Sequence, residues 1–178
     1  MKDGTVLLVP YDPNEKSPIY KLVGWVIKKI TKEDFTHTAI FFNGKYYDDT
    51  LIFKGLNIKS GVRSLDAPDY PVGKTLEYVG ELTPEQFVRM QSYLIFYANE
   101  PIHYSILKLV TLSFVYPTKW FWDLIGWVPF SKFLFGEVCS TFVAEAWKFA
   151  GVDLFKGIEQ DELVSPGDFL RSTLLKEI

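Results

Sequence analysis

The sequence predicts an α+β domain in which an antiparallel sheet, formed mainly by the first half of the chain, packs against helices. Asn43-Gly44 separates two runs rich in β-branched and aromatic residues, the strongest short signal for a β-hairpin. Apolar residues recur at helical spacing between positions 19 and 30, and again after Cys139. At 178 residues the chain is expected to form one domain spanning 1–178, with a sizeable core.

The first elements follow from short local patterns. The β-branched run from Thr5 to Val9 predicts a strand. Ser17-Pro18 resembles a helix N-cap followed by proline in the first turn. The helix that it opens is expected to end near Thr31, and its apolar positions are Ile19, Leu22, Val23, Val26, Ile27 and Ile30.

The hairpin is expected to join strands Phe35 to Phe42 and Lys45 to Thr50. Both central residues of a two-residue turn of this type need positive φ, which Asn-Gly tolerates. The turn fixes the register, which pairs Phe42 with Lys45, Phe41 with Tyr46, Ile40 with Tyr47 and Ala39 with Asp48.

Weaker strand patterns run from Phe53 to Leu65 and from Thr75 to Val79. A Thr-Pro-Glu-Gln run at 83–86 combines an N-cap, a proline and a capping-box glutamine, so it predicts a helix to about Tyr97. The helix at Cys139 turns Val138, Cys139, Phe142, Val143, Ala146 and Ala150 to one face, and Gly151 ends it. The Ser-Pro-Gly-Asp run at 165–168 starts a last helix by the same logic.

Composition narrows the function classes. A formal net charge of −3 with scattered basic residues argues against a nucleic-acid partner. The apolar run from Val6 to Val9 is too short for a signal peptide, so we expect cytoplasmic synthesis without Sec export. A phage-encoded protein, or one exported by a non-Sec route, would fit the same pattern.

Aromatic residues gather between positions 114 and 135. Pro117, Gly126 and Pro129 interrupt this segment, and it falls short of the roughly 20 apolar residues of a membrane span. One interpretation is an aromatic cap over the core. The other is a surface that contacts a membrane, a lipid or an acyl chain.

Cys139 is the only cysteine, and it is placed where a helix begins. Unpaired N–H groups and the helix dipole favour a thiolate at that position, and the thiolate is the nucleophilic form. A lone cysteine at apolar helical spacing is also typical of a small core residue. One Cys and two dispersed His show no metal-ligand spacing, no phosphate-binding glycine loop is present, and we expect no metal and no cofactor.

His37 is the candidate base for this thiol. The period of a strand places His37 on the same side of the hairpin as Asp48, as diagonal neighbours, with Asp49 on the other side. A carboxylate that orients an imidazole beside a thiol follows the logic of a catalytic triad. Alternatively, His37 is structural and Asp48 lies in a solvated loop, or His103 is the partner of Cys139.

The order of these motifs resembles the circularly permuted NlpC-like branch of the papain-fold cysteine peptidases and amidases. Residues 3–9 resemble its opening strand, with Thr5 in place of the usual acid. Residues 35–40 resemble its histidine strand, 138–143 its Cys-Ser helix start, and 165–169 its closing Ser/Thr-Pro-x-Asp helix. The resemblance implies a papain-like sheet packed on the cysteine helix, with Cys139, His37 and Asp48 as nucleophile, base and orienting residue.

Three functions are therefore compared. The first is a thiol hydrolase of amide bonds, with cell-wall peptides as the substrate class that the resemblance implies. It would use the Cys139 N–H as an oxyanion donor, with Tyr11 or Tyr104 as a second donor. The second is a lipid-directed acyl hydrolase or acyltransferase on the same fold, and the third is a non-catalytic interaction protein. A polar groove beside Cys139 would favour the amide hydrolase. An apolar tunnel there would favour the lipid-directed enzyme, and a Cys139 sealed from solvent would favour the interaction protein.

Overall fold

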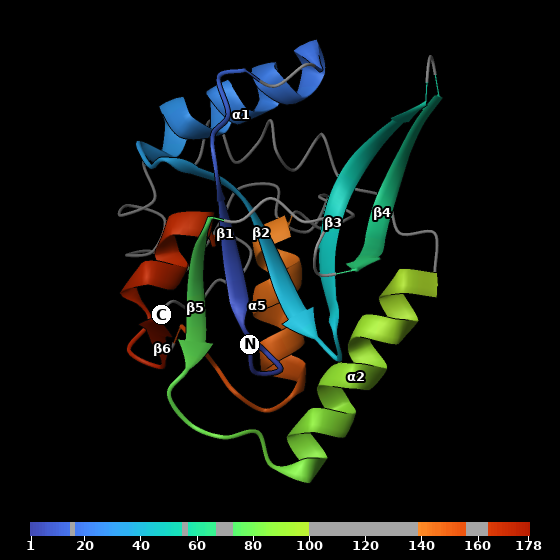
Figure 1. The fold of residues 1–178 in the computed structure, drawn as a ribbon, viewed down its shortest axis with the longest axis vertical. Coiled ribbons are helices and arrows are strands. Elements are labelled where there is room, and N and C mark those ends of the chain that lie inside the picture. The colour runs from blue at the N-terminus through green and yellow to red at the C-terminus, as the bar shows by residue number, and fades with distance from the viewer. Residues whose placement is uncertain (15–16, 55–56, 67–72, 100–138, 156–163) are drawn as a thin grey trace, which may run out of the picture.

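Six antiparallel strands form one sheet in the order β4-β3-β2-β1-β5-β6 (Figure 1). This computed structural model describes residues 1–14, 17–54, 57–66, 73–99, 139–155 and 164–178. The α+β class predicted from the sequence is therefore present. The strands are β1 (Val6–Pro10), β2 (Phe35–Phe42), β3 (Lys45–Lys54), β4 (Asn57–Asp66), β5 (Lys74–Tyr78) and β6 (Leu175–Glu177).

The helices start and end where the sequence signals predict. In α2, the Thr83 N–H donates to Gln86 Oε1 at 2.9 Å and the Gln86 N–H donates to Thr83 Oγ1 at 3.3 Å, so the capping box forms. Gly151 follows α5 with φ of +87°, the left-handed conformation expected after a helix. The described helices are α1 (Pro18–Thr31), α2 (Pro84–Asn99), α5 (Cys139–Phe149) and the 3₁₀ helix η5 (Pro166–Arg171).

The main core lies between the sheet and the pair of helices α2 and α5. Trp147 and Phe142 of α5 are fully buried there against Val6, Leu8 and Ile40. In Figure 1, α5 lies behind β1 and β2, and α2 runs beside the lower end of β3. A second, smaller cluster forms around buried Leu7, Ala39 and Tyr46.

The hairpin forms with the predicted turn. Asn43 and Gly44 have φ of 49° and 78°, and the recorded pairs are Ile40–Tyr47, Phe41–Tyr46 and Phe42–Lys45. The ladder ends there, so the expected Ala39–Asp48 pair lies beyond it. Past this point β3 continues to Lys54 and pairs with β4 along its full length, forming a two-stranded arm that curves away from β2 (Figure 1).

Three expectations about elements need correction, and one strand was not expected. The pattern from Phe53 to Leu65 is not one strand, because β3 continues to Lys54 and β4 starts at Asn57. The last helix is a six-residue 3₁₀ helix, and strand β6 after it was not predicted. Leu22, expected on the apolar face of α1, is 60% exposed, because α1 contacts the sheet through another face.

Gly4 illustrates why a small residue precedes β1. It has φ of +84°, and a Cβ there would come within 2.6 Å of Cζ2 of the buried Trp147 ring. Only glycine combines the left-handed backbone with this close approach at low cost. The turn at Gly4 therefore allows the start of β1 to pack closely against Trp147 of α5.

Candidate active site

Cys139 is the first residue of α5, and its position follows from the packing of that helix. Cys139, Phe142, Val143 and Ala146 occupy one helical face, and all four are buried. The neighbouring Ser140 hydroxyl donates to the Val164 carbonyl oxygen at 2.5 Å, which ties the start of α5 to the segment before η5. The thiol is therefore held at a fixed helix start, and Cys139 is only 4% exposed.

His37 and Asp48 come from adjacent strands, β2 and β3. The His37 Nε2 atom lies 2.7 Å from Asp48 Oδ2, so the contact expected from the hairpin forms. The Asp48 side chain is 1% exposed and that of His37 is 22% exposed. A carboxylate this deeply buried needs charged or polar partners, because its charge has lost its hydration.

Arg63 on β4 supplies the other partners of Asp48. Arg63 lies opposite Asp48 in the β3–β4 ladder. Its Nε donates to Asp48 Oδ1 at 2.7 Å and its Nη2 donates to Oδ2 at 3.0 Å. This two-point contact is geometrically specific, and it fixes the plane of the carboxylate that binds His37.

His37 lies where β2 departs from regular pairing. The β2–β3 ladder has ended at Ile40, and the β1–β2 register shifts between Val9, the partner of His37, and Pro10. Irregularities of this kind re-aim side chains, and they are common beside functional sites. The strand period alone therefore does not fix the direction of the His37 ring.

The thiol of Cys139 completes the group. It lies near enough to the His37 ring to raise the pKa of that histidine. Because Nε2 faces Asp48, Nδ1 is the ring nitrogen available to the thiol. His37 therefore lies between a carboxylate and a thiol that are far apart in the sequence.

The electrostatics of the three groups are strongly coupled. Burial by itself would lower the pKa of His37, but Cys139 and Asp48 together outweigh burial and raise it to about 10. Burial likewise would raise the pKa of Asp48, but hydrogen bonds and attraction from His37 and Arg63 hold it well below its usual range. The favoured state near neutral pH is an imidazolium with an ionised carboxylate.

The structure thus brings together Cys139, His37 and Asp48, the three residues predicted from the sequence. Arg63 does not follow from the sequence pattern, because a single strand over 53–65 places no partner opposite Asp48. Gly55 is the signal that could have divided that segment into two strands. The alternative in which Asp48 lies in a solvated loop is wrong, because Asp48 and its neighbour Asp49 are both fully buried.

Other expected participants are placed differently. The Tyr11 ring packs against Gly24 of α1 and lies 5.6 Å below the Lys28 ammonium, so its recorded contacts are with α1. His103, Tyr104 and the aromatic segment 114–135 lie outside the described residues. The roles predicted for them stay predictions.

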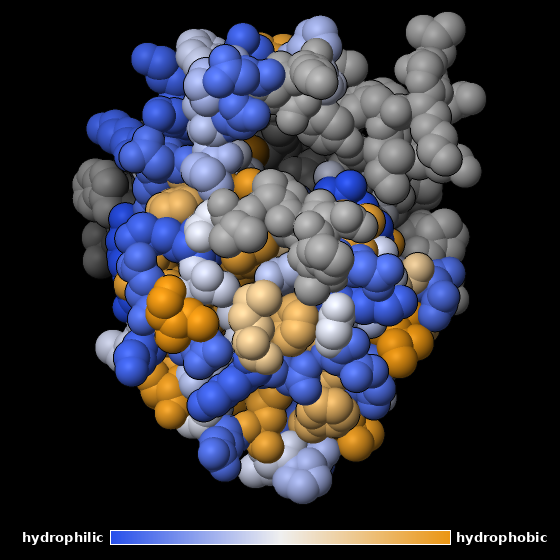
Figure 2. Space-filling view, viewed as in Figure 1, coloured by the Kyte–Doolittle hydropathy of each residue, from blue (hydrophilic) through white to orange (hydrophobic). Residues whose placement is uncertain are grey.

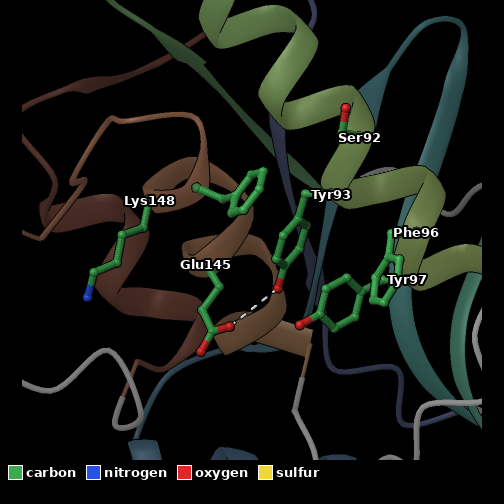
Figure 3. Close-up of a pocket in the computed structure, with 7 residues that line it drawn as sticks. Ser92, Tyr93, Phe96, Tyr97, Glu145 and Lys148 are labelled. Carbon is green, nitrogen blue, oxygen red and sulfur yellow. Dashed lines mark hydrogen bonds between the residues drawn. The ribbon is translucent and has the colours of Figure 1, made fainter.

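A surface pocket lies between α2 and the second half of α5 (Figure 3). The Tyr93 hydroxyl points across it toward Glu145 Oε2 at 3.4 Å, and Tyr97 stacks on Tyr93 with ring centroids 4.3 Å apart. Its α5 residues follow Cys139 by more than a helical turn, and neither Cys139 nor His37 lines it. This pocket is therefore neither the polar groove nor the apolar tunnel expected beside Cys139.

Two negative findings concern the described part of the chain. Among those residues, no group of three or more His, Cys, Asp or Glu side chains is placed to hold a metal ion. No described helix has the length and apolar character needed to cross a bilayer.

Comparison with family models, with curated proteins and with solved structures finds no match for this chain. The function is therefore argued from the geometry and charge of the site.

Proposed function

We propose that this protein is a thiol hydrolase that cleaves amide bonds through Cys139, His37 and Asp48. The observation that carries the proposal is the position of His37, whose Nε2 atom lies 2.7 Å from the buried Asp48 carboxylate and whose pKa is raised by the nearby Cys139 thiol. The burial of Cys139 is what a core residue also shows, so the proposal rests on the position of His37, which a structural cysteine does not need. The papain-like fold in permuted order, and cell-wall peptides as substrates, belong to the same proposal and rest on the motif resemblance.

The chemistry follows from a thiol that lies beside a protonated histidine. The Cys139 sulfur attacks the carbonyl carbon of the amide, and the Cys139 backbone N–H at the start of α5 stabilises the oxyanion. His37, protonated at the start, donates its proton to the leaving nitrogen as the C–N bond breaks and a thioester forms. Neutral His37 then takes a proton from water, which attacks the thioester carbonyl and releases the acid and the thiolate.

Asp48 and Arg63 have positioning roles in this scheme. Asp48 accepts a hydrogen bond from the nitrogen of His37 that faces away from the thiol, which fixes the ring and stabilises the imidazolium. Arg63 holds the Asp48 carboxylate in one plane. Both residues act through His37 and do not contact the reacting carbonyl.

The first test is the rate of iodoacetamide alkylation of Cys139 at pH 6.5. Because Cys139 is the only cysteine, the modification reports one site. An adjacent imidazolium favours the reactive thiolate, so we expect His37→Ala to slow the reaction about tenfold or more. His103→Ala is the matched control, since it removes the other histidine.

The outcomes separate the hypotheses. Slowing by His37→Ala alone supports the proposal and justifies a screen of murein peptides, with Cys139→Ser as the inactive control. If His103→Ala produces the slowing, the base has been assigned to the wrong residue. Indifference to both substitutions, with alkylation only on unfolding, would leave a non-catalytic interaction protein with Cys139 in its core.

A second candidate substrate class is a lipid acyl group. It is favoured by an exposed apolar pair, Leu22 and Trp25, on the helix that packs beside the start of β2. Hydrolysis of lipid esters or amides by the same thiol, abolished in Cys139→Ser, would move the proposal to this class.

A further inference from the structure

Helix α1 carries a local concentration of positive charge. Lys21, Lys28 and Lys29 lie in α1 and Lys32 follows it, while residues 17–32 contain no Asp or Glu. The whole chain, by contrast, has a formal net charge of −3. The basic residues therefore form a local patch, and its partner is expected to be anionic.

Helical spacing gathers these lysines around two exposed apolar side chains. Leu22 is 60% exposed and Trp25, three residues on, is 49% exposed on the same face. The Lys29 ammonium lies 5.9 Å from the centroid of the Trp25 ring. The opposite face packs inward through Gly24 and Ile27.

The charge on this face is only slightly neutralised by the described residues. Its recorded ion pair joins Lys28 to Asp34 at 2.8 Å, and that aspartate side chain is 79% exposed. A pair so exposed is weak and can rearrange when another anion approaches. In Figure 2 the surface over α1, at the top, is mostly hydrophilic.

We propose that the exposed face of α1 docks onto the surface of an anionic lipid bilayer. A helix lying in the membrane interface places tryptophan and leucine among the head groups and upper acyl chains. Its lysines extend their ammonium groups to lipid phosphates and carboxylates. A purely polyanionic partner such as nucleic acid would use the lysines but give no role to an exposed leucine.

The patch also lies beside the candidate active site. Gly24 of α1 packs against Thr36, the residue before His37, and against Tyr11. In Figure 1, α1 crosses above the upper ends of β1 and β2. A bilayer held by α1 would therefore lie near the end of the sheet that carries His37.

The test is binding of the full chain to vesicles of phosphatidylcholine with 30% phosphatidylserine, measured by co-sedimentation. Each lysine near an anionic surface is expected to contribute about fivefold to partitioning, so Lys21→Gln/Lys29→Gln should weaken binding about 25-fold at low salt. Lys45→Gln/Lys176→Gln is the matched control, because it makes the same charge change at exposed sites on strands β3 and β6. Pure phosphatidylcholine vesicles, and 0.5 M salt, should each abolish most of the binding.

Trp25→Phe tests the position of the contact. Bromine-labelled acyl chains should quench tryptophan fluorescence in the wild type, and Trp25→Phe should lose that quenching while vesicle binding persists. Quenching that survives in Trp25→Phe would overturn the proposal and assign the contact to another tryptophan, such as those of the 114–135 segment. Equal binding by the two lysine variants, or binding to heparin but not to vesicles, would also overturn it. These readouts involve no catalysis, so they stand or fall independently of the hydrolase proposal.

Discussion

Two groups of charged side chains, each built on an arginine–carboxylate contact, have opposite electrostatics. In the first, a single acid, Asp48, lies between two cations, His37 and Arg63. In the second, two acids, Glu33 and Asp168, share Arg171, with distances of 3.0 and 2.8 Å. The ratio of acids to cations is therefore reversed between the two groups.

The pKa shifts follow that ratio. The pKa of Asp48 is held well below its usual range, because attraction and hydrogen bonds from His37 and Arg63 exceed the effect of burial. The pKa of Glu33 is raised, first by burial and then by repulsion from Asp168. Both carboxylates are shielded from water, so burial alone does not decide the direction of the shift.

The two groups also differ in what they connect. The Glu33 group caps η5, since the Ser165 N–H donates to Asp168 Oδ2 at 2.8 Å and the Ser165 hydroxyl reaches both carboxylates. It fastens the end of the chain to the turn between α1 and β2. The Asp48 group instead fixes one histidine ring beside a thiol. The comparison separates a group that maintains the fold from one suited to chemistry.

The largest expected effect comes from Asp48→Asn. The Asn side chain has no negative charge to place between His37 and Arg63, and its NH₂ group replaces one of the two oxygens that accept from them. We therefore expect a loss of about 2–3 kcal/mol in the free energy of unfolding, with Arg63 left partly buried. Asp168→Asn, the matched change, should cost roughly 1 kcal/mol, because it also relieves repulsion on Glu33. Urea unfolding measures both. Equal losses would contradict the distinction between the two groups.

The second effect concerns the backbone beneath Glu33. A Cβ at Gly167 would overlap the Glu33 carboxylate, so Gly167→Ala should destabilise the fold by about 2 kcal/mol. Adding Glu33→Ala should recover part of that loss, giving a non-additive double-mutant cycle in urea unfolding. The control is Gly151→Ala, where no atom lies within 4 Å and only the left-handed backbone opposes the substitution. Additive losses would mean that the carboxylate does not occupy this position.

The smallest effect is a difference in pH dependence. Because the pKa of Glu33 is raised in the folded state, the folded chain binds that proton more tightly than the unfolded chain does. The fold therefore gains stability as the pH falls through this pKa. The wild type should therefore gain stability relative to Glu33→Gln as the pH falls from 7 towards 4.5. Relative to Asp48→Asn, its advantage should not grow over the same interval, because a lowered pKa keeps Asp48 ionised there and His37, whose pKa Asp48 helps to raise, is already protonated in the wild type. Parallel slopes in urea unfolding would refute the contrast.

Much of the fold could be predicted from local sequence. The Asn43-Gly44 turn, the capping box at Thr83 and the stop at Gly151 depend on backbone conformations and hydrogen bonds within a few residues. The hairpin contact between His37 and Asp48 followed from the same turn, because it fixes which residues face each other across the strands.

Longer-range pairing could not be predicted in the same way. Strand β6 pairs with β5, although the two strands lie far apart in the sequence. Its sequence is short and mostly exposed, with no strand pattern of its own. The exposure of Leu22 was also unforeseen, because helical spacing defines a face without defining what that face contacts.

By itself the sequence determined most of the described elements and the register of the hairpin next to its turn, and it singled out three candidate site residues, because turns, caps and strand period are short-range consequences of residue type. Only the tertiary structure decided that Arg63 holds Asp48, that the β1–β2 register shifts next to His37, and that Glu33 and Asp168 share Arg171. These contacts join strands and helices whose relative placement is set by the burial of the whole core. No local pattern of residues encodes that placement.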